Sequence, residues 1–430
     1  MKLKTVEIEN YRAIDKMRLP LHPSLIVFHG DNAHGKTSVL SAIAVGLGAI
    51  PSLLPEVSGI GFRKTDPRQR TRPMRIALEA TDGTAWGRRW SGGGNEKSYA
   101  RKAMPIRQLR EKIYEIIEAD RDGRPIDLPI VAFYDTDRAV FDRLPRSRRS
   151  KTEFPRYFAL QDALSRQTNF GDFLKWFYAK ENEELREQRE WRDFDERLLE
   201  LESVRKAIES MVPGVSEPRV KLKPLRFAVT VRDHRGKKKE LALDQLSGGF
   251  RIMLALAADL ARRMAQGNPH LDDPLTSEAI VLIDEVELHL HPSWQQRILT
   301  DLTRTFPNTQ FIVSTHSPQV LSDIHPEQIV ELIVEKGRIV ARNAAAPTYG
   351  AEAGDVLVTV MGVDERPPRN EFAKALKRYM GLINDGKGET KAARTLRKDL
   401  DQMSPNDPGL ERADMELRRR KMVAGRSASR

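Results

Sequence analysis

The chain has 430 residues, of which 40% are hydrophobic and 31% are charged, values that are ordinary for a globular protein. It contains no cysteine, which excludes disulfides, zinc–thiolate sites and thiol nucleophiles and fits a cytoplasmic protein. We expect no membrane span, because charges interrupt the apolar runs, and no signal peptide, because the first residues alternate in polarity. The length predicts two or three domains, or one large domain with an appendage.

The chain is strongly basic, with a formal net charge of +11 and an isoelectric point of about 9.6. The excess is gathered in three clusters, and such clusters are typical of surfaces that follow a phosphate backbone. Solvated loops and tails give the same pattern, so charge alone leaves nucleic-acid binding open. The clusters are Arg63, Lys64, Arg68, Arg70 and Arg72, then residues 143–151 (RLPRSRRSK), then residues 418–421 (RRRK).

The first predicted elements are a strand, a loop and a helix. The segment 5–12 (TVEIENYR) alternates like a strand, and 24–28 (SLIVF) is a continuous apolar run typical of a buried strand. The segment 37–48 (TSVLSAIAVGLG) has the apolar spacing of a helix. The residues between them, 29–38 (HGDNAHGKTS), therefore lie in the strand–loop–helix context that a phosphate-binding loop requires.

Residues 30–37 match the P-loop pattern G-x4-G-K-T without a mismatch. Glycines in such a loop let backbone N–H groups turn toward phosphate oxygens, the lysine adds positive charge, and the threonine hydroxyl can bind Mg²⁺. A glycine-containing turn that happens to precede a lysine is the alternative. The predicted ATP-binding residues of this loop are Gly30, Asn32, Gly35, Lys36, Thr37 and Ser38, with Thr37 also a predicted Mg²⁺ ligand.

The middle of the chain predicts a hairpin, a strand and a long amphipathic helix. The hairpin spans 73–90 and turns at Asp82-Gly83, and the strand spans 129–135 (PIVAFYD). One long helix, or two, spans 173–212 and is too short to form a long coiled-coil arm. Its apolar stripe is Trp191, Phe194, Leu198, Leu201, Ile208 and Met211, and Pro213-Gly214 ends it.

Two more buried strands, 279–285 (AIVLIDE) and 309–315 (TQFIVST), precede a hairpin at 329–343 that turns at Gly337. Strands that alternate with helices predict an α/β layered fold. Helices follow Pro367-Pro368, and Asp407-Pro408 begin a last helix that we expect to be short, basic and frayed. The apolar faces of the earlier helices are Phe372, Leu376, Tyr379 and Ile383, and Ala392, Ala393, Leu396, Leu400 and Met403.

Two acids, Asp284 and Glu285, end the strand 279–285. A buried apolar strand that ends in two acids is the form of a Walker B strand. Asp284 is then predicted to hold Mg²⁺ through water, and Glu285 to polarise the water that attacks ATP. Two acids at an exposed strand end are the alternative, which the preceding P-loop disfavours.

Three later motifs are ambiguous when each is taken alone. Residues 247–249 (SGG) precede a long apolar helix, where a serine and bare glycine backbone can bind an anion or form an ordinary N-cap. His316 lies just past a buried strand, where a surface histidine is the alternative to a functional one. Glu287, His289 and His291 alternate along the chain, and we consider but do not favour a zinc site there.

Taken in order, these motifs resemble the ABC-type ATPases of the RecF/SMC/OLD-like group. LSGG resembles their signature motif, FIVSTHSP their switch histidine, and ELHLHP their D-loop region. The resemblance implies a head over residues 1–345, built from a P-loop sheet, an antiparallel β subdomain and a helical lobe near 150–215. It also implies a head-to-tail homodimer or higher oligomer, in which Ser247, Gly248 and Gly249 of one protomer contact the γ-phosphate held by the P-loop of another.

The same resemblance assigns further roles. His316 would contact the γ-phosphate, and the loop that contains ELHLHP would line the dimer interface. Arg12 would lie near the nucleotide, although a strand-end arginine on a basic surface fits almost as well, and the region around Asp66 and Gln69 is the predicted Q-loop. The predicted catalytic residues are Lys36, Glu285 and His316, the predicted metal ligands are Thr37 and Asp284, and the cofactors are ATP and Mg²⁺.

The C-terminal sequence is similar to that of PtuA-type ATPases, which belong to the Septu anti-phage system and also accompany some retrons. The similarity lies in 348–367 and 406–423, and 129–138 (PIVAFYDTDR) is similar to the P-x-x-x-Y-x-x-x-R stretch of the compact, arm-less members. It implies a regulatory ATPase that controls a separate, PtuB-like HNH nuclease, with residues 346–430 as a helical partner-binding region.

Three other functions compete with this one. A RecF-like ATPase that clamps DNA in an ATP-dependent way uses the same head and would use the basic clusters. An ABC transporter subunit is disfavoured by the helical insert and by HLHP in place of a transporter-like D-loop. A built-in nuclease is disfavoured because Asp399 and Asp401 lie in a helical pattern, and 332–337 (LIVEKG) reads as one arm of the hairpin.

Overall fold

The chain folds into two units, residues 1–356 and 357–430. The computed structural model describes residues 1–69, 73–90, 106–136, 154–165, 170–223, 225–232, 236–344 and 346–428. Arg70, Arg72, Arg138 and the basic cluster 143–151 lie outside the described residues. The boundary between the units falls inside helix α10 (Ala353–Thr359), whereas the sequence predicts a boundary after residue 345.

A mostly parallel, six-stranded sheet runs through the first unit in the order β13-β12-β3-β11-β10-β6. Its strands are β3 (Leu25–His29), β6 (Ile130–Tyr134), β10 (Ala279–Ile283), β11 (Thr309–Ser314), β12 (Ile329–Glu335) and β13 (Arg338–Asn343). Every residue of β3, β6, β10 and β11 is buried, as their uninterrupted apolar runs predict for a sheet covered on both faces. The predicted hairpin at 329–343 is confirmed as β12 and β13.

The parallel pairing decides where the functional loops meet. β10 pairs in parallel with both β11 and β6, and β3 pairs in parallel with both β11 and β12. Because the carboxyl ends of parallel strands share one sheet edge, the loops that follow β3, β10, β11 and β6 come together there. These loops carry the P-loop, Asp284 and Glu285, His316, and Asp135.

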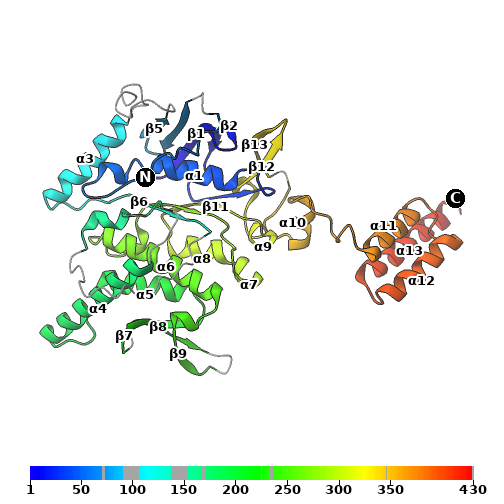
Figure 1. Cartoon of the computed structure of the whole chain (residues 1–430). Coiled ribbons are helices and arrows are strands. Elements are labelled where there is room, and N and C mark those ends of the chain that lie inside the picture. The colour runs from blue at the N-terminus through cyan, green and yellow to red at the C-terminus, as the bar shows by residue number, and fades with distance from the viewer. Residues whose placement is uncertain are drawn as a thin grey trace. The chain divides into compact units, whose positions relative to one another are not determined.

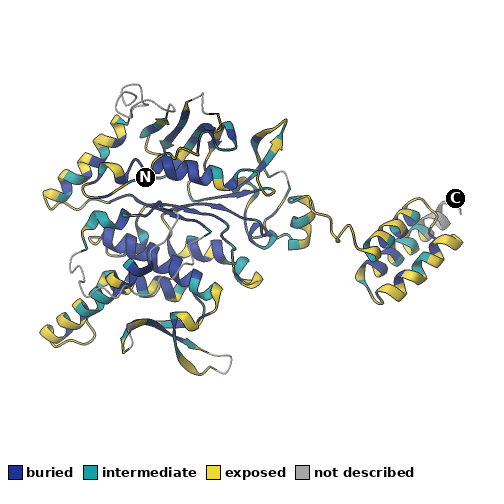
Figure 2. Cartoon of the chain, in the orientation of Figure 1, coloured by how far each residue is buried: buried dark blue, intermediate teal, exposed yellow. Residues whose placement is uncertain are grey.

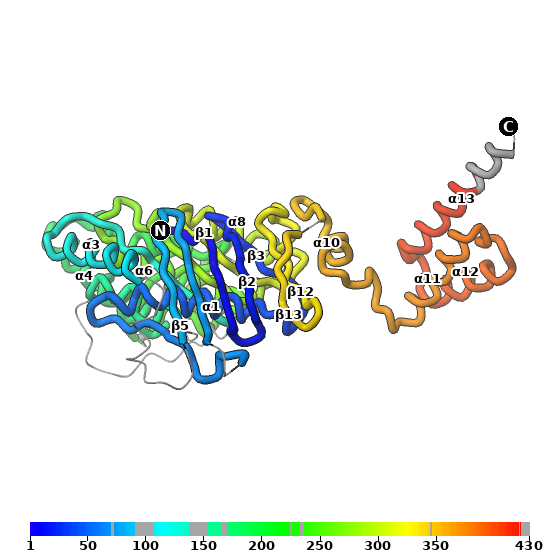
Figure 3. The backbone as a smooth tube through the Cα atoms, turned by 90° about the horizontal axis from the view of Figure 1, so that it is seen from above, coloured from blue at the N-terminus to red at the C-terminus, as the bar shows by residue number. Residues whose placement is uncertain are grey.

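A four-stranded antiparallel sheet lies on the other side of helix α1 (Lys36–Leu47), as Figures 1 and 3 show. Its order is β2-β1-β4-β5, and its strands are β1 (Leu3–Tyr11), β2 (Ile14–Pro20), β4 (Met74–Ala80) and β5 (Ala85–Trp90). The predicted hairpin at 73–90 is confirmed as β4 and β5. Helix α1 is therefore enclosed between two sheets and is buried along most of its length (Figure 2).

The enclosure of α1 explains one apolar segment. Among the described residues, the helical segment Lys36–Leu53 is long and apolar enough to cross a membrane by length and composition alone, with a mean hydropathy of 1.4. This corrects the expectation that charges interrupt every apolar run. Since 78% of the segment is buried within the fold, its apolar character is that of a core helix.

Helices cover the opposite face of the parallel sheet (Figure 1). The longest buried one is α6 (Gly248–Gly267), which packs against α5 (Leu199–Met211) and α4 (Phe170–Trp191). A small antiparallel sheet in the order β7-β8-β9 packs against α4 and α5. The remaining elements of this unit are α3 (Arg107–Arg121), α7 (Pro292–Gln295), α8 (Ile298–Thr305), α9 (Pro318–Leu321), β7 (Val215–Leu222), β8 (Leu225–Arg232) and β9 (Lys238–Ala242).

The predicted helix at 173–212 is two helices, α4 and α5, with a break at 192–198. Arg192 adopts a left-handed φ of +53°, which ends α4. Trp191 and Phe194 are 73% and 78% exposed, whereas Leu201 and Ile208 are fully buried. The interpretation of these residues as one apolar stripe is therefore wrong for Trp191, at the end of α4, and for Phe194, in the break, where the helical spacing is coincidental.

In the described residues of the second unit, 357–428, three helices follow the end of α10: α11 (Glu371–Asn384), α12 (Lys391–Met403) and α13 (Pro408–Ala428). The α11 face predicted from the sequence contributes to the core, whereas Ala392 and Met403 of α12 are exposed. Helix α13 spans 21 residues, so the expectation of a short last helix is wrong. The core residues are Leu376, Tyr379, Ile383, Ala393, Leu400, Leu410 and Ala413.

Candidate ATP site

The P-loop runs from β3 into α1 and is packed against the β12–β13 hairpin. Gly30 and Gly35 adopt φ values of +142° and +89°. A Cβ atom at Gly30 would lie 2.3 Å from the carbonyl oxygen of Leu332, and one at Gly35 would lie 2.6 Å from Cδ1 of Ile339. The backbone angles therefore favour glycine at both positions, and at Gly30 the close approach of the Leu332 backbone requires it as well.

Lys36 begins α1 and is 6% exposed. Its ammonium group donates hydrogen bonds to the carbonyl oxygens of Gly30 at 2.7 Å and Asp31 at 2.9 Å. Burial lowers the pKa of Lys36, and the nearby carboxylates of Asp284 and Glu285 act in the opposite direction. A nearby anion strongly stabilises the charged form of a partly desolvated ammonium group, so Lys36 is suited to bind phosphate.

The other predicted ligands of the loop occupy its rim and the first turn of α1. Asn32 and Thr37 are exposed, and Ser38 is half-buried. The N-terminus of a helix favours anions, so Thr37 and Ser38 lie where a triphosphate is stabilised. Within the described part of the chain these three side chains have no hydrogen-bond partner, which leaves their hydroxyl and amide groups free to bind a nucleotide or its metal ion.

Asp284 follows β10 at the same sheet edge and is 1% exposed. Its backbone N–H donates to the carbonyl oxygen of Tyr134 at 2.9 Å, and its carboxylate accepts the hydroxyl hydrogen of Ser314. Oxygen ligands such as a carboxylate and a threonine hydroxyl are those that Mg²⁺ prefers. The donor set of Asp284 and Thr37 therefore fits Mg²⁺.

Glu285 adopts a left-handed φ of +47°, which costs a non-glycine residue about 1–2 kcal/mol. Two hydrogen bonds hold this conformation: the N–H of Glu285 donates to Oγ of Ser314 at 2.8 Å, and the N–H of Val286 donates to the carbonyl oxygen of Ser314 at 3.0 Å. Strained backbone is typical of residues that must present a side chain at an active site. Ser314, the last residue of β11, thus fixes the backbone of the predicted catalytic acid.

The four predicted residues His316, Glu287, His289 and His291 lie at two different sites. The backbone N–H of His316 donates to Oε1 of Glu287 at 2.6 Å, so Glu287 faces the loop after β11. His289 and His291 instead line the pocket at the start of α6. The three side chains do not converge, and among the described residues no group of three acids or histidines is arranged to hold a metal ion, so the zinc alternative receives no support.

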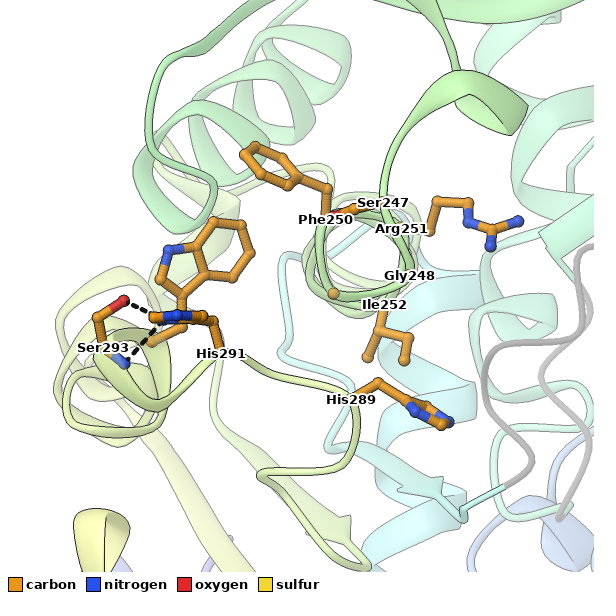
Figure 4. Close-up of a pocket in the computed structure, with 10 residues that line it drawn as sticks. Ser247, Gly248, Phe250, Arg251, Ile252, His289, His291 and Ser293 are labelled. Carbon is orange, nitrogen blue, oxygen red and sulfur yellow. Dashed lines mark hydrogen bonds between the residues drawn. The ribbon is translucent and has the colours of Figure 1, made fainter. Parts of the chain in front are cut away.

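The start of α6 opens onto a pocket of about 700 Å³ that is lined by residues from 247–252 and 289–294 (Figure 4). Ser247 is the extended residue before the helix, and its side chain forms no capping hydrogen bond. A Cβ atom at Gly248 would meet no atom within 4 Å, whereas one at Gly249 would lie 3.0 Å from the carbonyl oxygen of His289. The backbone at the N-terminus of a 20-residue helix is therefore accessible from this pocket.

The P-loop does not contribute to this pocket. Its lining comes from the two segments just named, and no described residue of 29–38 is among them. The rings of Phe250 and Trp294 pack edge to face at 4.5 Å and join the helix start to α7. The structure thus brings together Lys36, Asp284, Glu285 and His316 at one sheet edge, and places Ser247, Gly248 and Gly249 in a pocket of their own.

Arg12 is held between β1 and α1. Its Nε donates to Oδ1 of Asp66 at 3.0 Å, and one terminal nitrogen donates to Oγ of Ser41 at 3.2 Å. The segment 66–69 is anchored further by the N–H of Gln69, which donates to Oδ1 of Asn10 at 2.8 Å, while the Gln69 side chain is exposed. The structure therefore joins Arg12 to Asp66, and the nucleotide role of either residue stays a prediction.

Sequence reasoning missed Asp135, which follows β6 and is 6% exposed. β6 pairs directly with the Walker B strand β10, and Ile283 is the register partner of Tyr134. Asp135 consequently ends the strand next to Asp284, at the same sheet edge as the P-loop. The available signal was Asp135 itself, the acid that ends the predicted strand 129–135.

Family models match most of the first unit. The model described as "AAA domain, putative AbiEii toxin, Type IV TA system" matches residues 25–322, and the model described as "AAA ATPase domain" matches residues 1–47. The chain belongs to this AAA ATPase family. The longer match begins in β3 and ends after His316, so it includes the P-loop, the signature-like helix start, Asp284 and Glu285.

Two relatives match almost the whole ATPase. The "Retron Ec83 probable ATPase" of Escherichia coli is 27% identical over 98% of this chain and 87% of its own length. The "Retron Vc95 probable ATPase" of Vibrio cholerae is 23% identical over 93% of this chain and 86% of its own length. These matches and the family models identify the protein as an ATPase of the AAA/ABC type, in the RecF/SMC-like group.

A third relative matches a shorter part. The "Septu protein PtuA" of Bacillus thuringiensis is 30% identical over 32% of this chain and 38% of its own length. Among solved structures, the "SMC head domain from Thermotoga maritima" is 13% identical over 80% of this chain and all of that chain, with a TM-score of 0.40.

Proposed function

We propose that this ATPase is the nucleotide-dependent regulatory subunit of an anti-phage defence complex, and that its ATP-bound protomers associate head to tail and control a separate HNH nuclease. The retron ATPases that match over nearly the full length, and the partial match to PtuA, support the defence role. The extent of the retron matches favours a defence ATPase over a transporter subunit, because they include the C-terminal helices as well as the head.

One observation carries the head-to-tail arrangement: the accessible helix start at Ser247 lies in a pocket that contains no residue of the P-loop. The backbone N–H groups at the start of a long helix stabilise a phosphate. A nucleotide on Lys36 of the same chain is outside this pocket, which supports the proposal that Ser247 binds the phosphate of a nucleotide held by a second protomer. Two protomers then form two composite ATP sites.

Each residue of such a composite site has a chemical role. Lys36 binds the phosphates, and Thr37 and Asp284 would hold Mg²⁺, whose positive charge neutralises charge that develops on the phosphates. Glu285 orients the attacking water and accepts its proton, and His316 donates a hydrogen bond to the γ-phosphate. Ser247 completes the site from the second protomer, so hydrolysis by a monomer is expected to be slow.

Mixing two inactive variants tests the composite site. Lys36→Ala removes ATP binding but leaves the Ser247 loop intact, and Ser247→Arg blocks that loop but leaves the P-loop intact. We expect each variant alone to be inactive, and an equimolar mixture to regain part of the ATPase activity, because one of the two sites in a mixed dimer is complete. A mixture as inactive as its components would refute the head-to-tail site.

The nuclease partner needs its own test. Tagged ATPase should co-purify with an HNH nuclease encoded beside it, and the deletion of residues 357–430 should abolish this association while ATP binding remains. Failure to recover a nuclease would refute the defence complex without affecting the composite site. A DNA clamp would instead bind plain duplex DNA only with ATP, and its affinity would fall steeply with salt.

A further inference from the structure

We propose that Glu287 is a positioning residue, which holds the loop of His316 in register with the loop of Glu285. The proposal rests on the ATP site described above and adds a residue to it. From the sequence, Glu287 is considered as a metal ligand and as part of the loop that would line the dimer interface, whereas the structure directs its carboxylate toward the backbone and hydroxyl of the neighbouring loop.

Each oxygen of the Glu287 carboxylate is engaged by a different residue. The hydroxyl of Thr315 donates to Oε2 at 2.7 Å, and the backbone N–H of His316 donates to Oε1 at 2.6 Å. Hydrogen bonds to an ionised acceptor are shorter and stronger than those between neutral groups. Glu287 therefore fixes two consecutive residues of the loop, the second of which carries the predicted switch imidazole.

The loop that Glu287 holds is also tied to the P-loop strand. The N–H of Thr315 donates to the carbonyl oxygen of Phe28 in β3 at 3.0 Å, and its hydroxyl oxygen accepts the N–H of Ser317 at 3.0 Å. Thr315 is fully buried, so this hydroxyl has no access to water. The removal of the Glu287 carboxylate would leave a buried hydroxyl and the N–H of His316 without their acceptor.

The geometry separates Glu287 from Glu285, although only Val286 lies between them in the sequence. Glu285 is the residue whose strained backbone is presented at the sheet edge. Glu287 is half-buried, and both of its carboxylate oxygens accept hydrogen bonds from the neighbouring loop. Its hydrogen bonds therefore act on the site through His316, whereas its charge also acts on Lys36, whose pKa it raises against the effect of burial. A variant that keeps the hydrogen bond and removes the charge separates these two effects.

Steady-state ATPase kinetics on the full-length chain test this inference. We expect Glu287→Ala to lower kcat by about 10- to 100-fold, the effect of losing charged hydrogen bonds, with a much smaller change in KM. Glu287→Gln keeps an acceptor for the N–H of His316 and should recover most of kcat. Because the hydrogen bonds of Glu287 act through His316, the double variant Glu287→Ala/His316→Ala should be no slower than His316→Ala alone.

Two further variants keep the outcome clear. Thr315→Val removes one of the two hydrogen bonds without touching Glu287, and should lower kcat by about tenfold even if Glu287→Ala does not fold. Glu327→Gln is the matched control, because it neutralises the exposed carboxylate of another glutamate, and it should leave kcat unchanged. The positioning role would be overturned if the fold-losses in kcat of Glu287→Ala and His316→Ala multiply in the double variant. It would also be overturned if Glu287→Gln is as slow as Glu287→Ala.

The same experiment separates this inference from the site on which it rests. If His316→Ala keeps the full kcat, the switch role of His316 is wrong and the positioning role falls with it. If His316→Ala is slow but Glu287→Ala and Thr315→Val are both as fast as the unmodified chain, the ATP site stands and the inference alone is overturned.

Discussion

The hydroxyl of Ser314 links the two acids of the Walker B strand, because it donates to the carboxylate of Asp284 and its oxygen accepts the N–H of Glu285 at 2.8 Å. Ser314 is fully buried at the end of β11, so water cannot replace it. One side chain thus orients the predicted Mg²⁺ ligand and supports the left-handed backbone of the predicted catalytic acid.

We therefore predict that Ser314→Ala lowers kcat for ATP by about 10- to 100-fold, since two buried hydrogen bonds are lost and one of them has an ionised acceptor. Measurements of kcat over a range of Mg²⁺ concentrations should also show a higher Mg²⁺ requirement. Ser322→Ala is the matched control, because Ser322 lies just after α9 and, among the described residues, its hydroxyl donates to the carbonyl oxygen of Gln319 alone. Unchanged kcat and Mg²⁺ dependence in Ser314→Ala would contradict this link.

Gly30 gives a second prediction, on stability. A methyl group there would lie 2.3 Å from the backbone oxygen of Leu332, and backbone cannot move aside as a side chain can. We expect Gly30→Ala to lower the free energy of unfolding by at least about 1–3 kcal/mol, from strain at its φ of +142° and from displacement of β12.

The matched control for Gly30 is Gly236, which has a φ of +75° and nothing within 4 Å of an added Cβ atom. Gly236→Ala should lower the free energy of unfolding by only about 1–2 kcal/mol, the cost of a left-handed backbone at a non-glycine residue. Urea unfolding of both variants provides the comparison. Equal losses would show that the contact with Leu332 relaxes without a penalty.

A buried ionic cluster on α6 gives the third prediction. Asp259 accepts hydrogen bonds from Arg262 at 2.9 Å, from Arg263 at 2.7 Å and from the hydroxyl of Tyr134 at 3.0 Å. Burial opposes the charged form of Asp259, but the two arginines outweigh burial and lower its pKa to about 2. The cluster ties the signature-like helix to β6, the strand beside Asp284.

Asp259→Ala should lower the free energy of unfolding by about 3–5 kcal/mol, because it leaves two buried guanidinium groups without their acid. Tyr134→Phe should lower it by only about 1 kcal/mol, since the ion pairs remain. Thermal and chemical unfolding measure both. A loss for Asp259→Ala no larger than that for Tyr134→Phe would mean that the arginines find other acceptors.

The sequence predicted the strands and their end residues better than the loops between them. β3, β10 and β11 are each buried on both faces, so each is a continuous apolar run whose end can be located, and the functional residues follow those ends. Parallel pairing then brings Lys36, Asp284, Glu285 and His316 together without further information. The roles of these residues in hydrolysis stay predictions until activity is measured.

The residues that sequence reasoning missed depend on contacts between distant segments. Glu287 contacts Thr315 and His316, which lie 28 and 29 positions away, and nothing in its own neighbourhood indicates that contact. The strands β7 to β9 were not predicted either. Charged residues interrupt the apolar alternation of β7 and β9, whereas β8 (LRFAVTVR) alternates regularly and was an available signal. The helical spacing predicted that Trp191 lies on a buried helix face, but the helix ends there and the side chain is exposed.

The contact between α4 and β7 gives the last prediction, which concerns pH. Glu181 of α4 accepts the N–H of Val220 at 3.0 Å. Burial raises the pKa of Glu181 from 4.5 to about 7, and the Val220 hydrogen bond and Arg205 only partly oppose this, while Glu184 reinforces it. In the folded protein Glu181 therefore holds a proton that the unfolded chain releases near pH 4.5.

Because the folded state binds more protons than the unfolded state between pH 4.5 and 7, the contribution of Glu181 to stability falls as pH rises through this window and levels off above it. Glu181→Gln keeps an acceptor for Val220 and removes the titration. Its Tm relative to the unmodified chain should therefore rise between pH 5 and pH 8, measured by thermal unfolding at fixed ionic strength. The matched control is Glu183→Gln, an exposed acid on the same helix whose Tm difference should not follow this course. A constant Tm difference for Glu181→Gln across this range would show that Glu181 is ionised throughout, and that Arg205 and the N–H of Val220 compensate for its burial.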